Sequence, residues 1–160
     1  GTSIIAAEKE EKLLETLPRE LVEVAKGFKE YLSVIPESKI AMEVGVSAMH
    51  DVTEGGVFGA LWELGEASGV GITAHLDKIP IKQETIEVCE VFKINPYMLI
   101  SSGSMMIGCE KGNLLVEKLE EAGINAAVIG RATEGNDRIV VSRDETRYIG
   151  PAGSDELYKI

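Results

Sequence analysis

The stretch HDVTEGGVFGALWELGEASGVGI, from His50 to Ile72, decides how this 160-residue chain is interpreted. It opens with a short extended segment, passes through two adjacent glycines and then carries leucines at helical spacing. The pattern predicts a strand or extended turn over 47–52, a helix that ends at Gly69, and a second strand over 70–76. Strands that alternate with helices of this length are typical of a sheet covered by helices.

The flanking sequence continues the alternation on both sides. Helices are predicted over 6–17, 19–32, 36–45, 81–92 and 111–122, and strands over 105–109, 124–130 and 137–142. We therefore expect an α/β (α+β) sandwich, a mixed sheet with helices packed on one side. The expected organisation is a helical segment over 1–45, an α/β core over 46–142 and a surface-lying or loose tail over 143–160.

Composition excludes several classes of partner. Sixteen Lys and Arg against 27 Asp and Glu give a net charge of −11, so nucleic acid and membrane surfaces are not expected as partners. Hydrophobic residues make up 44% of the chain, which is enough to build a core. Cys89 and Cys109 lie in apolar surroundings and are predicted to be reduced core residues. We expect a cytoplasmic protein without a membrane segment or leader.

The predicted helix start in HDVTEGG has the local chemistry of an anion site. Gly55 and Gly56 have no Cβ atoms, so a ligand can approach the free amides and the positive end of the helix dipole. Phosphate and carboxylate groups bind at such helix starts. His50, just before this turn, can donate a proton or pair with an anion near neutral pH.

The same segment also allows a purely structural interpretation. Asp51 and Glu54 have the spacing of a reciprocal cap, and Thr53 is a competing N-cap. Adjacent glycines at a helix start often serve close packing alone, and two neighbouring carboxylates repel an incoming anion. His50 and His75 are 25 residues apart with no thiolate nearby, so no metal site is predicted.

The quoted stretch resembles the start of the C-terminal domain in the AIR synthase-related superfamily. That group includes aminoimidazole-ribonucleotide synthetase, selenophosphate synthetase, thiamine-monophosphate kinase and the hydrogenase expression/formation protein HypE. The resemblance is closest to HypE, whose pattern is His-Asp-Pro-Thr-Arg-Gly-Gly followed by a helix and EASGVGI. It continues through Ile79-Pro80-Ile81, Asn95-Pro96-Tyr97, Val128-Ile129-Gly130 and Thr133-Glu134, and it covers 1–141.

The resemblance implies a two-domain, ATP-using enzyme, usually a homodimer formed through its N-terminal domains. In that family ATP and Mg²⁺ are held chiefly by N-terminal motifs that this sequence lacks. The chain would then be the acceptor-side domain, inactive without the N-terminal ATP-binding domain and unable to bind ATP or Mg²⁺ tightly alone. Its acceptor would be a small molecule or a protein.

The resemblance also implies roles for five residues, which would face the cleft between the two domains. His50 would be the acid/base or phosphate-contacting residue. Asp51 and Thr53 would cap the helix and contact substrate, while Gly55 and Gly56 would allow close backbone approach to phosphate.

Three departures from the HypE pattern indicate a paralogue with an unknown acceptor. Glu54 stands where HypE has Arg, and Ser101-Ser102-Gly103 corresponds to Asn-Glu-Gly. The C-terminal ELYKI lacks the Pro-Arg-Ile-Cys whose cysteine carries the thiocarbamate group. Two alternatives remain: a stand-alone phosphate- or nucleotide-binding module, and an assembly module that contacts a maturation partner.

Overall fold

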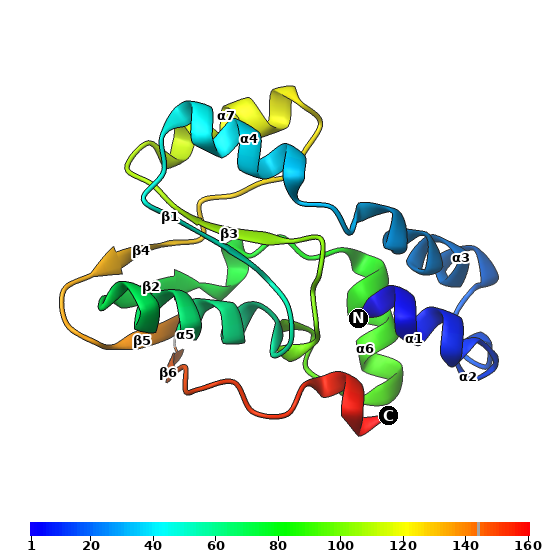
Figure 1. Cartoon of the computed structure of the whole chain (residues 1–160). Helices are drawn as coiled ribbons and strands as arrows, with labels where there is room; N and C mark the ends of the chain where they lie inside the picture. The colour runs from blue at the N-terminus through cyan, green and yellow to red at the C-terminus, as the bar shows by residue number, and fades with distance from the viewer. Residues whose placement is uncertain (144) are drawn as a thin grey trace.

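The computed structural model describes residues 1–143 and 145–160 and contains a mixed four-stranded sheet (Figure 1). The strand order is β4–β2–β5–β6, with bounds Gly130–Thr133, Gly71–His75, Arg138–Ser142 and Glu145–Tyr148. Strands β2 and β5 are parallel, and the edge strands β4 and β6 pair antiparallel to them. A separate antiparallel pair joins β1 (Ala48–Asp51) to β3 (Met105–Gly108). The expected α/β class with a mixed sheet is confirmed.

Helices account for most of the remaining described chain. The α-helices are α1 (Thr2–Glu8), α2 (Glu10–Leu14), α3 (Arg19–Gly27), α4 (Ile35–Val44), α5 (Gly56–Ser68), α6 (Gln83–Phe92) and α7 (Gly112–Glu121). Short 3₁₀ turns are η1 (Phe28–Tyr31), η2 (Leu76–Lys78), η3 (Pro96–Met98) and η4 (Glu156–Lys159). Among the described residues, no helix is both long enough and apolar enough to cross a bilayer.

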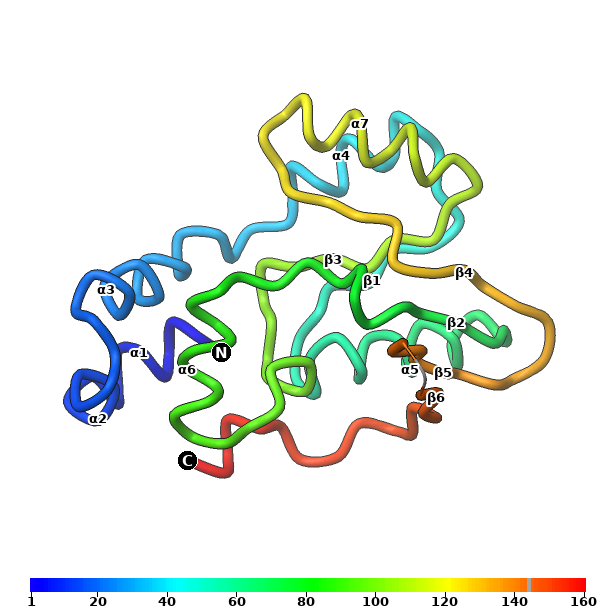
Figure 2. Tube along the Cα trace, turned by 180° about the vertical axis from the view of Figure 1, so that it is seen from behind, coloured from blue at the N-terminus to red at the C-terminus, as the bar shows by residue number. Residues whose placement is uncertain are grey.

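Three buried clusters hold these elements together. One lies among α1, α2, α3 and α6 and includes Ile5, Leu13 and Val88. A second packs α5 against the sheet through Leu61 and Ile72. The third joins α4 to α7, which lie together apart from the four-stranded sheet in both views (Figure 2). Since α5 has one end at β1 and packs on β2 and β5, its first turn is fixed relative to both sheets.

Two predictions for the N-terminal helices need adjustment. The helix predicted over 6–17 begins at Thr2 and is divided at Lys9 into α1 and α2. The helix predicted over 19–32 starts as expected but tightens from α3 into η1 at Phe28.

The strand predicted over 124–130 is wrong. The strand β4 begins only at Gly130, and residues 124–129 are not in strand, although the carbonyl of Ile129 still accepts from the amide of His75 at 2.8 Å. Ile124 and Ala126 pack against the α4–α7 cluster, while Ile129 packs against the α5 cluster. Apolar side chains in this segment therefore reflect an extended connection between two clusters instead of sheet pairing.

The C-terminal segment is more ordered than its weak periodicity predicts. Residues Glu145–Tyr148 add strand β6 to the sheet by pairing with β5. The chain then runs past α5 and ends beside α6, as both views show (Figures 1 and 2). Leu157 and Ile160 pack against the helical cluster that contains Ile5. This course brings the C-terminal segment to the first turn of α5.

Candidate functional site

The predicted anion site at the start of α5 lies against a carboxylate of the same chain. The amide of Gly55 donates a 2.7 Å hydrogen bond to Oδ2 of Asp155. The other oxygen of Asp155 accepts from the amide of Leu157 at 2.8 Å, at the start of η4. Asp155 is only 3% exposed, so this carboxylate is buried with two backbone donors. The helix start therefore binds an anionic group, and in this structure that group is Asp155.

Both glycines of the turn are required by its geometry. Gly55 and Gly56 have φ values of +79° and +60°, in the left-handed region that favours glycine. A Cβ on Gly56 would lie 2.6 Å from the carbonyl oxygen of Tyr97, and a Cβ on Gly55 would lie 2.8 Å from Cβ of Ala152. Gly56 thus serves the close packing of α5 on η3, while Gly55 combines close packing with the anion contact.

The side-chain caps predicted for α5 are not formed. Its N-cap is Gly55, with no side-chain capping hydrogen bond, so neither Thr53 nor the Asp51–Glu54 pair has the predicted local role. Within the turn, the amide of Gly56 donates to the carbonyl of Thr53 at 3.1 Å. The amide of Gly55 is satisfied by Asp155 of the C-terminal segment.

His50 is held by acidic side chains. Its Nε2 lies 2.7 Å from Oε2 of Glu63 on α5, and its Nδ1 lies 3.8 Å from Oδ1 of Asp51. The His50 side chain is 28% exposed, so solvent reaches this group. The contact with Glu63 orients the His50 ring against the side of α5.

The anchoring of the C-terminal segment was not predicted from the sequence. Glu156 is 4% exposed; its Oε2 accepts from the amide of Asn95 at 3.3 Å and its Oε1 pairs with Lys159. The hydroxyl of Tyr158 donates to Oε1 of Glu54 at 3.3 Å. The available signal was local: an Asp followed by a short helical turn is a typical N-cap pattern, and Asp155 caps η4 in this way.

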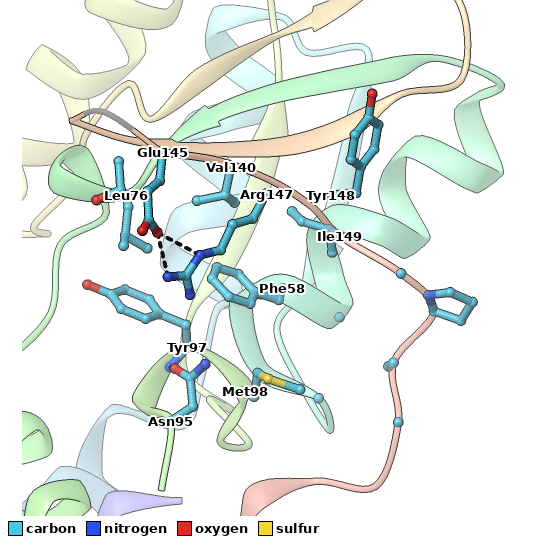
Figure 3. A pocket seen from close by; sticks show the side chains of 17 residues that line it. Phe58, Leu76, Asn95, Tyr97, Met98, Val140, Glu145, Arg147, Tyr148 and Ile149 are labelled. Atoms are coloured by element: carbon cyan, nitrogen blue, oxygen red, sulfur yellow. Dashed lines mark hydrogen bonds and ion pairs between the residues drawn. The ribbon is translucent and has the colours of Figure 1, made fainter.

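A cavity of about 470 Å³ adjoins the anion contact. It lies between α5, η3, the β5–β6 edge of the sheet and the segment 149–153 (Figure 3). Gly55 and Gly59 form part of its wall, and Pro151 and Ala152 pass along its side. The C-terminal segment that carries Asp155 to the helix start therefore also encloses this cavity.

The described part of the chain contains two cysteines in different surroundings. Cys89 is buried and Cys109 is half-buried, and both are free thiols. Burial raises the pKa of the Cys89 thiol to about 12, which suppresses the reactive thiolate. Within residues 1–143 and 145–160, no group of three or more His, Cys, Asp or Glu side chains is placed to hold a metal ion.

Comparison with known proteins gives consistent matches. The chain matches the family described as AIR synthase related protein, C-terminal domain, over residues 1–142. A Methanocaldococcus jannaschii protein assigned to hydrogenase expression/formation is 33% identical over 102 residues, which cover 61% of this chain and 30% of that protein. Carbamoyl dehydratase HypE of Rhodobacter capsulatus is 28% identical over 97 residues, covering 58% of this chain and 28% of HypE.

The fold agrees with these matches. The crystal structure of Escherichia coli HypE, a hydrogenase maturation protein, gives a TM-score of 0.69 at 23% identity, covering 79% of this chain and 42% of that one. The chain spans less than a third of the length of the two curated relatives. Sequence match and fold together show that this chain belongs to the AIR synthase-related proteins, as their C-terminal domain.

Proposed function

We propose that this chain is the acceptor-side domain of a HypE-like, ATP-dependent enzyme and needs an N-terminal ATP-binding domain for activity. One observation carries the proposal: the amide of Gly55 at the start of α5 binds a buried anionic group, the carboxylate of Asp155. A phosphoryl oxygen has the same hydrogen-bonding requirement as a carboxylate oxygen. In the complete enzyme, the phosphate or activated acceptor would take this position.

The proposed dependence on ATP is supported by solved structures of related proteins. One solved HypE structure is a complex with ATP, and another is a complex of HypE with HypF. The matched stretch covers less than half of each of those chains. We therefore propose ATP as a ligand of the complete parent. The proposal extends to Mg²⁺, a homodimeric state, a cytoplasmic location and a small-molecule or protein acceptor, which rest on the family resemblance.

The proposed chemistry is phosphoryl transfer to an acceptor, and this domain contributes positioning and charge stabilisation. The amide of Gly55 would hold a phosphoryl oxygen, and Gly56 would keep α5 close to η3 so that the amide is fixed. His50, coupled to Glu63, would give or take a proton at the acceptor. Asp51 and Thr53 are both exposed at this end of the domain and would contact the acceptor.

Asp155 must leave the helix start before a phosphate can bind there. A single backbone amide satisfies one strong acceptor at this distance, and a carboxylate beside a phosphate would repel it. The C-terminal segment therefore competes with phosphate for the amide of Gly55. In the complete enzyme, withdrawal of the segment would open the site.

Calorimetric titration of this chain with Mg·ATP tests whether ATP binding requires the N-terminal domain. The proposal predicts no saturable binding below millimolar concentration, because the nucleotide motifs belong to the other domain. Saturable binding in the micromolar range would contradict the proposal and establish a self-sufficient nucleotide module.

The role of His50 is tested in a full-length enzyme that contains this domain. The substitution His50→Ala should reduce turnover by about 10²-fold or more if the ring transfers a proton in the reaction. The substitution His75→Ala provides the control, because His75 lies on β2, away from α5's first turn in sequence. Equal turnover of the His50→Ala and wild-type enzymes would remove His50 from the proposed site.

A further inference from the structure

The cavity beside Gly55 has an aromatic wall that the proposed phosphate chemistry does not use. Phe58 on α5 and Tyr97 on η3 stack with their ring centroids 5.5 Å apart and their planes 11° apart. Met98 and Leu76 extend the apolar lining on either side of the rings. The cavity's volume of about 470 Å³ lies within the range of pockets that hold small organic ligands.

A donor and an acceptor face this wall from the edge strand. Arg147 donates to Oε2 of Glu145 through Nη2 at 2.6 Å and through Nε at 3.1 Å. The two residues are two positions apart on β6, so their side chains leave the strand on the same side. In Figure 3 both side chains point toward Phe58 and Tyr97, whereas Tyr148 points away.

The geometry points to a binding site for an uncharged, planar heteroaromatic compound that carries a donor beside an acceptor on one edge. Its ring would extend the Phe58–Tyr97 stack, which favours flat ligands because every such ring has a π-face. Its edge would accept from Arg147 and donate to Glu145. An adenine-type edge, with a ring nitrogen next to an exocyclic amine, has this arrangement.

The charges that line this part of the cavity disfavour an ionic ligand. The opposite charges of Glu145 and Arg147 neutralise each other, and the chain as a whole carries a net charge of −11. An anion would meet Glu145 and a cation would meet Arg147, whereas a neutral edge with one donor and one acceptor satisfies both. This part of the cavity therefore favours a neutral ligand, unlike the adjoining phosphate position at Gly55, and the inference stands whether or not the proposed function is correct.

Adenosine is a suitable probe, because it has the required edge and no phosphate. NMR titration of the 160-residue chain should give saturable shifts of the side-chain signals of Phe58, Tyr97 and Arg147. Purine riboside, which lacks the exocyclic amine, should bind about tenfold more weakly. Equal binding of the two nucleosides, binding of ATP tighter than that of adenosine, or no saturable adenosine binding would each overturn the inference.

Surface variants test the edge contacts without disturbing the core. The Glu145 and Arg147 side chains are 62% and 76% exposed, so E145Q and R147Q should fold normally. Each should weaken adenosine binding about tenfold, since each replaces a charged hydrogen-bond partner with a neutral and weaker one. The matched control is R131Q, because Arg131 is an exposed arginine on β4, the opposite edge of the same sheet. Loss of affinity in R131Q equal to that in R147Q would contradict the assigned site.

Discussion

The carboxylate of Asp155 accepts a 2.7 Å hydrogen bond from the amide of Gly55, 100 positions earlier in the chain. This contact satisfies a helix-start amide for which α5 has no side-chain cap of its own. It also places a negative charge at the positive end of the α5 dipole. The contact therefore links the C-terminal segment, the fold of α5 and the proposed phosphate position.

Removing the Asp155 carboxylate should destabilise the chain. In Asp155→Ala the amides of Gly55 and Leu157 lose their acceptor, which should lower the free energy of unfolding by about 1–3 kcal/mol. The control Asp77→Ala changes an exposed aspartate on η2 and should stay within about 0.5 kcal/mol of wild type. Urea unfolding measures both; equal stability of the two variants would show that the Asp155 contact contributes nothing.

The two ends of α5 allow the packing and conformational roles of its glycines to be separated. Gly56 and Gly69 have similar φ values of +60° and +63°, but only Gly56 has neighbours that an added Cβ would meet. Gly69→Ala should cost about 1 kcal/mol for the left-handed conformation alone. Gly56→Ala should cost about 1–3 kcal/mol more, because its Cβ meets the backbone of Tyr97 and Leu99. A thermal unfolding comparison in which both variants lose the same stability would refute the packing role of Gly56.

The thiol of Cys89 gives a prediction for alkaline pH. Burial raises its pKa from 9.0 to about 12, so the folded chain keeps this proton over a range in which the unfolded chain loses it. Between these two values the unfolded state binds fewer protons, and stability should fall as pH rises. Cys89→Ala should lack this component of the slope. Urea unfolding at several pH values measures it, and identical slopes would contradict the prediction.

Alkylation distinguishes the two cysteines directly. At neutral pH, iodoacetamide should modify the half-buried Cys109 of the folded chain much faster than the buried Cys89. Mass spectrometry of the modified peptides identifies the site. Faster modification of Cys89 would show that the cluster around it opens readily.

The sequence predicted the β1–α5–β2 unit because its signals are local. Two glycines, helical spacing of leucines and a terminal Gly69 mark the helix, and alternation marks β2, in which Ile72 and Ala74 are buried. The anion-binding character of the turn followed from the same glycines. Local patterns therefore located the helix start and its two glycines, while its role as a phosphate site stays a prediction.

Local patterns could not predict that Asp155 binds at the start of α5. Asp155 and Glu156 are buried carboxylates in a segment without hydrophobic periodicity, and their partners Gly55 and Asn95 lie far away in sequence. Periodicity reports apolar faces and gives no signal for polar groups satisfied by distant amides. The misplaced strand over 124–130 has the complementary cause, since Ile124, Ala126 and Ile129 are partly buried against two clusters while the segment before Gly130 is not in strand.

The most direct test of the proposed function is an NMR titration of the wild-type and Asp155→Ala chains with inorganic phosphate. The readout is the backbone amides of Thr53, Glu54, Gly55 and Gly56. We expect phosphate to shift these amides, Gly55 most of all. Asp155→Ala should bind phosphate at least about tenfold more tightly than the wild-type chain, because the competing carboxylate is gone. Absence of saturable shifts at these four amides in Asp155→Ala would contradict the assignment of the α5 start as the phosphate position.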